Sequence, residues 1–151
     1  MARLIRFLRR FPGAAAAIGL LLLPVAMLGP ALLPGRVMSP ADNLFAVQPW
    51  KAVAPEVAPI NPLLNDVTYM FHPWLIYAAG EIRQGRFPLW NPHAFTGVPF
   101  FANPQTALLF PLNALAYILP IPTALTLISL LKLSAAGLGM YWFLRLLRTG
   151  R

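Results

Sequence analysis

Two long apolar runs, one near each end of the chain, are the main feature of its hydrophobic pattern. The first run, Phe11–Gly35, contains no charged residue, and the second run, Thr123–Leu147, contains Lys132 in its interior. A helix of about 20 consecutive apolar residues is long enough to cross a bilayer. The pattern therefore predicts transmembrane helices over residues 12–34 and 123–147.

A cleaved signal peptide is the alternative interpretation of the first run, because basic residues precede it. The apolar region of a signal peptide is usually shorter, about 7–15 residues, and a small-residue cleavage site follows it. The run is long for that role and no such site follows it, so an uncleaved signal anchor is favoured.

A third apolar segment, Thr106–Pro120, lies between the two long runs. At about 15 residues it is short for a full crossing, and it suits a re-entrant segment over residues 106–119. If it did cross, the two basic ends of the chain would lie on opposite sides of the membrane. We therefore expect two crossings, with three crossings as the alternative.

Helical periodicity marks residues 66–85, which we expect to form an amphipathic helix lying along the membrane surface. The apolar positions that carry this periodicity are Phe71, Leu75, Ala78 and Ile82. Asn65 or Asp66 is expected to cap the start of this helix. Gly85 is expected to follow its end, with Arg83 close to the negative end of the helix dipole.

Charge supports a membrane location. Charged residues make up 11% of the 151 residues and apolar residues 58%, with a mean hydropathy of +0.65, whereas a soluble domain is about 25% charged. The arginines that flank the apolar runs are Arg3, Arg6, Arg9, Arg10, Arg145, Arg148 and Arg151. This distribution follows the positive-inside rule and argues against nucleic acid as a partner, despite a net charge of +8.

The expected fold class is therefore an all-α integral membrane protein. Residues 1–11 and 148–151 are predicted to be cytoplasmic. Residues 35–122 are predicted to form one long extracytoplasmic loop that contains the interfacial helix and the re-entrant segment.

Candidate chemistry is limited by the scarcity of ionisable groups. The chain has four acids, two histidines and no cysteine, so a zinc site is not expected. Asp66 begins an aromatic, apolar segment, where a carboxylate could act as a general base or as a cation ligand. Helix capping is its alternative role, and the two roles are compatible.

Lys132 is the ionisable residue inside the second apolar run. A charge at such a position is costly and usually faces a helix bundle or a cavity. Its ammonium group could meet a lipid phosphate, or it could extend along its own stem to the membrane surface. Small residues that follow it predict close packing against another helix; they are Ser134, Ala135, Ala136, Gly137 and Gly139.

The stretch "GRFPLWNPHAFTGVPFFANPQ", residues 85–105, is rich in proline and aromatic residues and contains a single charge, Arg86. Its prolines disfavour a helix, and its aromatic rings suit the headgroup region of a membrane. The amides of Asn91, Asn103 and Gln105 could satisfy backbone groups or a hydroxylated ligand. We expect this stretch to form one wall of an interfacial cavity, with a buried structural plug as the alternative.

Two segments of the chain resemble a known family. "LNDVTYMFHPW" followed by "GRFPLWNPHAFTGVPFFANPQTALLFPLN" is similar to the first external loop of the bacterial membrane-protein family called YfhO. "KLSAAGLGMYWFLRLLRTGR" resembles the next membrane helix of that family. The resemblance covers roughly Ser39–Arg151 and is strongest over Asp66–Leu112. The order of these parts also resembles the wider GT-C glycosyltransferases, which use polyprenyl-phosphate-linked sugars as donors.

The resemblance implies a catalytic carboxylate in the first external loop. Asp66 takes that place, and Asp42 is the second candidate. A divalent cation is compatible with such a carboxylate but is not required by it. The candidate substrate-binding residues are Trp90, Asn91, His93, Asn103, Gln105 and Lys132.

Members of this family are much longer and have many more membrane spans. The chain is therefore expected to be an N-terminal portion that is inactive alone and needs further transmembrane helices, from the same or a partner chain. The resemblance implies the bacterial cytoplasmic membrane as its location, with membrane lipid and a lipid-linked sugar as partners.

Overall fold

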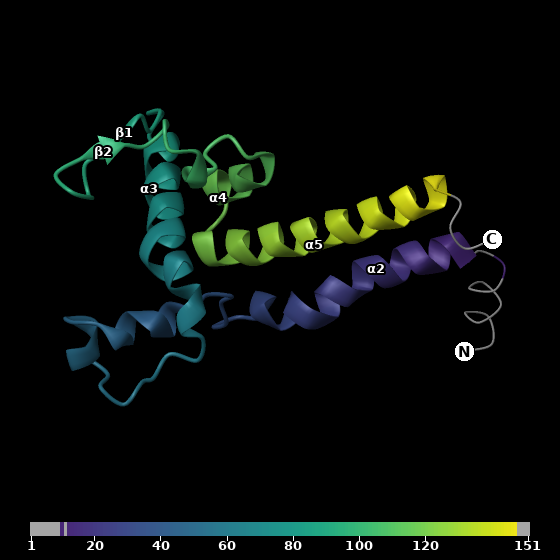
Figure 1. Ribbon diagram of the computed structural model, residues 1–151, viewed down its shortest axis with the longest axis horizontal. Coiled ribbons are helices and arrows are strands. Elements are labelled where there is room, and N and C mark those ends of the chain that lie inside the picture. Colours follow the sequence, from purple (N-terminus) through teal and green to yellow (C-terminus); the bar gives the residue numbers. More distant parts are fainter. Residues whose placement is uncertain (1–9, 11, 148–151) are drawn as a thin grey trace. The chain divides into compact units, whose positions relative to one another are not determined.

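The computed structural model of the chain describes Arg10 and residues 12–147, and these residues are mostly helical. Figure 1 shows the labelled helices and strands. The chain divides into two compact units, which are described separately. Unit 1 consists of Met1–Arg36 and Thr126–Arg151, and unit 2 consists of Val37–Leu125.

The described residues of unit 1 form two long helices. Helix α2, Pro12–Leu28, continues into a 3-10 turn, η1, Gly29–Leu32. Helix α5, Ile121–Leu146, belongs to unit 1 from Thr126 onward. The two helices lie side by side in Figure 1.

Contacts between α2 and α5 show that they run antiparallel. The Tyr141 hydroxyl donates to the backbone oxygen of Gly13 over 3.3 Å. Further along, Leu20 packs over Gly137, where an added β-carbon would lie 3.5 Å from Leu20 Cδ2. The first residues of α2 are therefore beside the last residues of α5. Gly137 belongs to the group of small residues for which close packing was predicted.

Both predicted apolar spans are helical. Pro12–Leu32 and Ile121–Leu146 are long and apolar enough to cross a membrane, by length and composition, with mean hydropathies of 2.1 and 1.6. The first ends at Leu32, two residues before the predicted bound of 34. The second begins at Ile121, two residues before the predicted Thr123.

A helical run in unit 2 is built from three kinds of turn. It starts with η4, Pro62–Leu64, passes through a π-helical segment, η5, Val67–Phe71, and ends as α3, His72–Arg83. The predicted helix of residues 66–85 therefore starts earlier than expected. Asn61 caps the first turn, because its side chain accepts a hydrogen bond from the amide of Leu63 over 3.1 Å.

Pro73 accounts for the π-helical segment. Proline has no N–H, and in an α-helix its ring clashes with the carbonyl group four residues earlier. The wider turn of η5 ends at Phe71, two residues before Pro73, with the His72 amide bonded to the oxygen of Val67. The end of α3 follows the prediction, since Gly85 adopts a left-handed conformation with φ +74°.

The apolar segment of residues 106–119 does not form one helix. It begins in the 3-10 turn η6, Pro104–Thr106, and continues through a second turn, η7, Pro111–Asn113, to the short helix α4, Ala114–Ile118. Helix α4 is far too short to cross a bilayer, which needs about 20 helical residues. The part of the chain that the structure describes therefore has two helices of spanning length, as favoured over three.

Arg83 joins α3 to the end of α4. Its guanidinium group donates to the backbone oxygens of Ala116 over 2.8 Å and of Tyr117 over 3.0 Å, and it also donates to Leu119. Carbonyl groups in the last turn of a helix have no partner within the helix. Arg83 lies in the last turn of α3, near the negative end of the helix dipole as predicted, and its side chain also caps α4.

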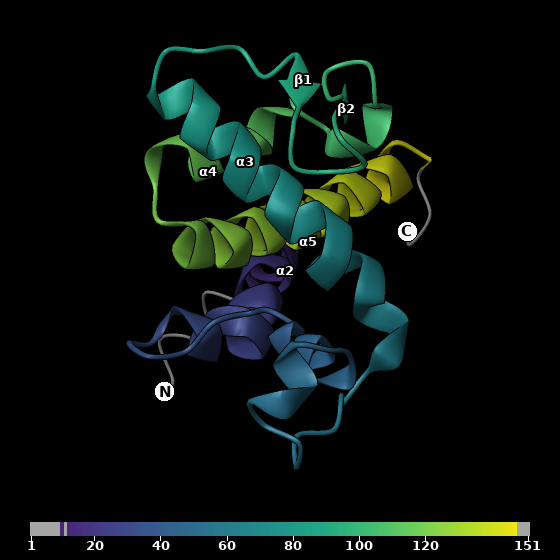
Figure 2. The ribbon, with the colours of Figure 1, turned by 90° about the vertical axis from the view of Figure 1, so that its left-hand side faces the viewer.

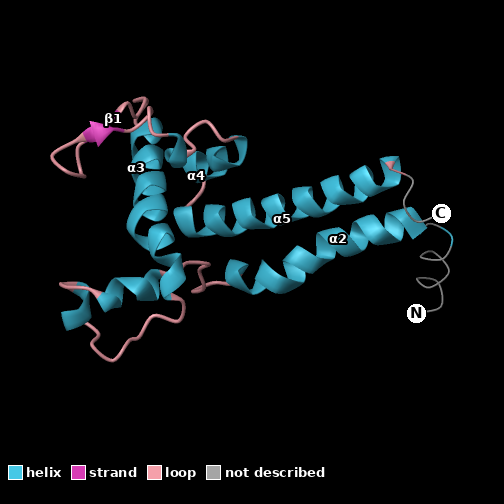
Figure 3. Cartoon of the chain, viewed as in Figure 1, coloured by secondary structure: helices cyan, strands magenta, loops and turns pink. Residues whose placement is uncertain are grey.

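Two short strands depart from the all-α prediction. Strand β1, Trp90–Asn91, pairs antiparallel with β2, Val98–Pro99. Figure 3 colours the labelled strand and the surrounding loops, and Figure 2 gives a second view of the hairpin beside α3. The residues of the connecting turn that have positive φ are Phe95, Thr96 and Gly97. Because this turn reverses the chain, the proline-rich stretch becomes a hairpin rather than an open loop.

Two 3-10 turns precede the helical run in unit 2; they are η2, Ala41–Ala46, and η3, Trp50–Ala52.

A small hydrophobic core forms where α3, the hairpin and α4 meet. Its buried members are Ala78, Phe100 and Leu108, and its partly buried members are Trp74, Tyr77, Ile82 and Tyr117. This core fixes the hairpin and α4 on α3.

Candidate functional site

Asp66 is exposed at the start of the π-helical segment. Its carboxylate makes no capping hydrogen bond to the backbone of that segment. Asp66 therefore does not cap the helical run, which was the alternative role considered for it. Asn61 caps the run instead. The Asp66 carboxylate is accessible to a ligand from solvent.

Asp42, the second candidate acid, lies on η2, which is attached to the π-helical segment. Thr68 donates to the backbone oxygen of Pro40 over 2.7 Å, and Tyr69 donates to that of Asn43 over 2.6 Å. These bonds hold the segment after Asp66 against the turn that carries Asp42. The fold therefore brings the segments of the two acids together.

The two carboxylates differ in their bonding. Asp42 Oδ2 accepts a hydrogen bond of 2.6 Å from the amide of Ile60, which closes the loop between η2 and η4. Asp66 has no comparable bond to its helix. Asp42 thus has a clear structural role, and Asp66 is the better candidate for chemistry.

Asn43 is a buried residue that sequence reasoning did not select. Its side chain is fully buried, and its Nδ2 donates to the backbone oxygen of Asn61 over 3.2 Å. Its Oδ1 atom has no hydrogen-bond partner among the described residues. An asparagine in an irregular, proline-rich segment carries no local signal of burial, because its environment comes from residues distant in sequence.

His72 lies at the junction of the π-helical segment and α3. Its Nδ1 atom is 3.2 Å from the Ser39 hydroxyl. Burial lowers the pKa of His72 below its ordinary value, because desolvation penalises the charged imidazolium. The side chain therefore favours the neutral form, in which one ring nitrogen can accept a hydrogen bond.

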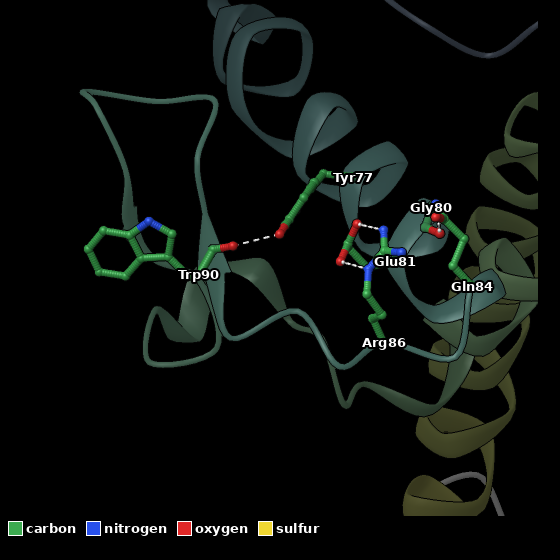
Figure 4. Close-up of polar contacts among 6 residues, drawn as sticks. All are labelled: Tyr77, Gly80, Glu81, Gln84, Arg86 and Trp90. Carbon is green, nitrogen blue, oxygen red and sulfur yellow. Dashed lines mark hydrogen bonds and ion pairs between the residues drawn. The ribbon is translucent and has the colours of Figure 1, made fainter.

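Trp90 is attached to α3 through its backbone. The Tyr77 hydroxyl donates to the Trp90 carbonyl oxygen over 2.6 Å (Figure 4). The indole ring of Trp90 lies against Gly97 across the hairpin. Burial raises the pKa of Tyr77, and the negative charge of Glu81 adds to this effect, so its hydroxyl stays a donor.

Asn91 and His93 have contacts within the hairpin. Asn91 is buried, and its Oδ1 accepts a hydrogen bond from the amide of His93 over 2.9 Å. The His93 ring packs edge-on to Tyr77, with ring centroids 5.5 Å apart. Both side chains therefore stabilise the turn that follows β1.

Asn103 and Gln105 also meet in a turn. Asn103 Oδ1 accepts a hydrogen bond from the amide of Gln105 over 3.0 Å and so caps η6. The oxygen of the Asn103 amide is thereby used within the chain. The exposed Gln105 side chain takes no part in this contact.

An ion pair stands at the end of α3. Arg86 donates from Nε and Nη2 to the two carboxylate oxygens of Glu81, over 2.8 and 2.6 Å (Figure 4). Hydrogen bonding from Arg86 lowers the pKa of Glu81 below its ordinary value. Gln84 closes the same turn, donating to the backbone oxygen of Gly80 over 3.0 Å (Figure 4). Arg86, the single charged residue of the stretch 85–105, thus fixes the start of that stretch on the end of α3.

Lys132 lies in α5, in the part of that helix that belongs to unit 1, and its side chain is exposed. The other candidate site residues belong to unit 2. Within unit 2, the structure brings the segments of the two candidate acids together through η2 and η5, while the candidate amides bond locally in the hairpin and in η6.

Metal-binding side chains do not cluster in the part of the chain that the structure describes. No group of three or more His, Cys, Asp or Glu residues comes together there. A divalent cation normally takes several oxygen ligands.

Comparison with protein-family models, with curated proteins and with solved structures found no match to the chain.

Proposed function

We propose that the chain is a membrane protein in which α2 and α5 cross the bacterial cytoplasmic membrane. Both helices have the length and hydropathy of a membrane span. Their antiparallel pairing brings the end of α2 that follows Arg10 beside the end of α5 that carries Arg145. The arginines near these two helix ends place both ends on the cytoplasmic side under the positive-inside rule. Residues 37–120 would then lie outside.

The proposed activity is transfer of a sugar from a polyprenyl-phosphate donor to a hydroxyl acceptor outside the cytoplasm. The chain would be the N-terminal part of a YfhO-like, GT-C-type glycosyltransferase, and further transmembrane helices would complete the donor site. The observation that carries this proposal is the Asp66 carboxylate, which is exposed, not used as a cap, and placed at the start of a π-helical segment. Such segments occur frequently at functional sites.

In this mechanism Asp66 is the general base. The acceptor oxygen forms a bond to C1 of the sugar while the bond from C1 to the phosphate oxygen breaks. Asp66 takes the proton of the acceptor hydroxyl, and polyprenyl phosphate leaves with the bonding electron pair. Attack opposite the leaving group inverts the configuration at C1.

The internal hydrogen bonds of the hairpin favour a second candidate function, a non-catalytic module that binds other membrane helices. The amide oxygens of Asn91 and Asn103 are both used within the chain, as expected for a structural plug rather than a ligand-binding wall. In this alternative the polar residues of unit 2 serve its stability, and Asp66 has no chemical role.

The test measures sugar transfer by the chain together with the further transmembrane helices that the proposal requires, with a radiolabelled polyprenyl-phosphate sugar as donor. Asp66→Asn is expected to reduce turnover by about 10²–10⁴-fold, the usual contribution of a general base. Glu56→Gln is the matched control, because it removes an exposed acid elsewhere in unit 2. Near-normal turnover of Asp66→Asn would exclude Asp66 from the chemistry, and altered assembly alone would favour the second function.

A further inference from the structure

Unit 1 contains a groove between the first residues of α2 and the last residues of α5. Small residues of α2 line one side, and aromatic and basic residues of α5 line the other. The lining residues are Gly13, Ala14, Ala17, Tyr141, Trp142, Arg145 and Leu146. The groove thus combines an apolar surface with one guanidinium group.

Arg145 is held in place by its neighbour one turn earlier. Its Nη1 donates to the Tyr141 hydroxyl over 3.0 Å, and its guanidinium carbon lies 5.8 Å from the centre of the Tyr141 ring. The same hydroxyl donates to the Gly13 backbone oxygen over 3.3 Å. The guanidinium group of Arg145, which lines the groove, is therefore oriented by α5 and α2 together.

Gly13 makes this arrangement possible. A β-carbon at Gly13 would lie 2.8 Å from Nη1 of Arg145 and 2.9 Å from the Tyr141 hydroxyl. Either distance is shorter than a normal contact, so any other residue would push both groups away. The absence of a side chain at this position is thus directly linked to the placement of the guanidinium group.

We infer that this groove binds the headgroup of an anionic phospholipid. A guanidinium group presents parallel N–H donors that match the oxygens of a phosphate. Ala14 and Ala17 offer an apolar path for the start of an acyl chain, and the indole of Trp142 suits the headgroup region. Charge complementarity selects a lipid with net negative charge over a zwitterionic lipid of the same chain length.

This inference depends on the membrane placement of α2 and α5 but not on sugar transfer. The cytoplasmic side is where the positive-inside rule places the arginines of the chain. Anionic lipids give the cytoplasmic leaflet its negative surface potential. The groove would therefore face the leaflet that is richest in its ligand.

The test is native mass spectrometry of the detergent-solubilised chain with equal amounts of phosphatidylglycerol and phosphatidylcholine of identical acyl chains. The wild-type chain is expected to retain phosphatidylglycerol preferentially. Arg145→Gln should reduce that preference by about tenfold, as expected for loss of a charge-assisted hydrogen-bond pair. Arg36→Gln makes the same change in net charge outside the groove and should leave the preference unchanged.

Gly13→Ala is a second variant that should weaken the preference through displacement of Arg145, while alanine favours the helical fold. Equal loss in Arg145→Gln and Arg36→Gln would overturn the inference, because net charge alone would then explain binding. Displacement of the lipid by millimolar inorganic phosphate would also overturn it in favour of a simple anion site.

Extraction of the chain from membranes by alkaline carbonate would overturn the membrane placement and this site together. Failure of Asp66→Asn to affect sugar transfer would leave the lipid site standing. The two proposals can therefore fail separately.

Discussion

The indole ring of Trp90 occupies the space in which a side chain at Gly97 would begin. A β-carbon at Gly97 would lie 2.8 Å from both Cε2 and Cζ2 of Trp90. Gly97 also has a φ of +117°, which side-chain-bearing residues rarely adopt. The hairpin therefore requires glycine at this position for two independent reasons.

Gly97→Ala should destabilise the hairpin by more than about 2 kcal/mol, because backbone strain and the clash with Trp90 add together. Hydrogen exchange at the Phe100 amide, which bonds to the Leu89 oxygen over 2.8 Å, would report this loss directly. Gly80→Ala is the matched control, since nothing lies within 4 Å of its β-carbon position inside α3. Gly80→Ala should leave stability unchanged or raise it. Equal loss of stability in Gly97→Ala and Gly80→Ala would contradict the role of strain and of the Trp90 clash.

Tyr77→Phe should loosen the hairpin by removing the hydroxyl that donates to the Trp90 oxygen. The net value of such a hydrogen bond is about 1 kcal/mol, which corresponds to about fivefold faster exchange of the hairpin amides. The phenylalanine ring keeps the edge-on contact with Phe100, at a centroid distance of 5.1 Å. Unchanged exchange would show that the hydroxyl bond contributes nothing to the stability of the hairpin.

Arg83→Gln should release α4 from α3, because the guanidinium group supplies donors to the last carbonyl groups of α4. Loss of about 1–2 kcal/mol is expected, in the range for hydrogen bonds to a charged group. The measurement is hydrogen exchange at the Leu119 amide, which bonds to the Leu115 oxygen.

Arg83→Lys and Arg86→Gln separate geometry from charge in this experiment. Lysine keeps the charge but lacks the fork that reaches several oxygens at once, so it should restore little protection. Arg86→Gln breaks an exposed ion pair with Glu81 and should leave exchange in α4 unchanged. Full rescue by lysine would show that charge alone holds α4.

Local sequence signals predicted the helices well. A long apolar run determines a span without reference to the rest of the chain. This is why both helical spans, Pro12–Leu32 and Ile121–Leu146, were located within about two residues, a normal uncertainty for helix ends. Gly85 was correctly expected to follow α3, since a left-handed residue is a local requirement. The start of the same helical run was placed too late, because the run begins with η4, whose cap Asn61 is held by a hydrogen bond from the distant Asn43.

Long-range contacts also limited prediction of the hairpin and the candidate site. The strands depend on Tyr77 and on the close approach of Trp90 to Gly97, which no periodicity encodes. The amide of Asn91, a candidate for binding substrate, accepts a hydrogen bond within the chain through its Oδ1 atom. The sequence indicated that the Asn91 amide needs a hydrogen-bond partner. Only the fold shows that this partner is the backbone amide of His93.

The burial of His72 predicts that unit 2 is less stable in mild acid. Desolvation lowers the pKa of His72 in the folded state, while the unfolded chain retains the ordinary value of 6.5. Below 6.5, and until the lowered pKa is reached, the unfolded state binds more protons, so stability falls as pH falls through this window. Thermal unfolding in detergent between about pH 7.5 and about pH 5.5 should therefore show a falling midpoint. His72→Gln, which has no imidazole to protonate, should flatten that dependence, whereas His93→Gln should keep it. A decline that survives in His72→Gln would assign the acid sensitivity to other groups.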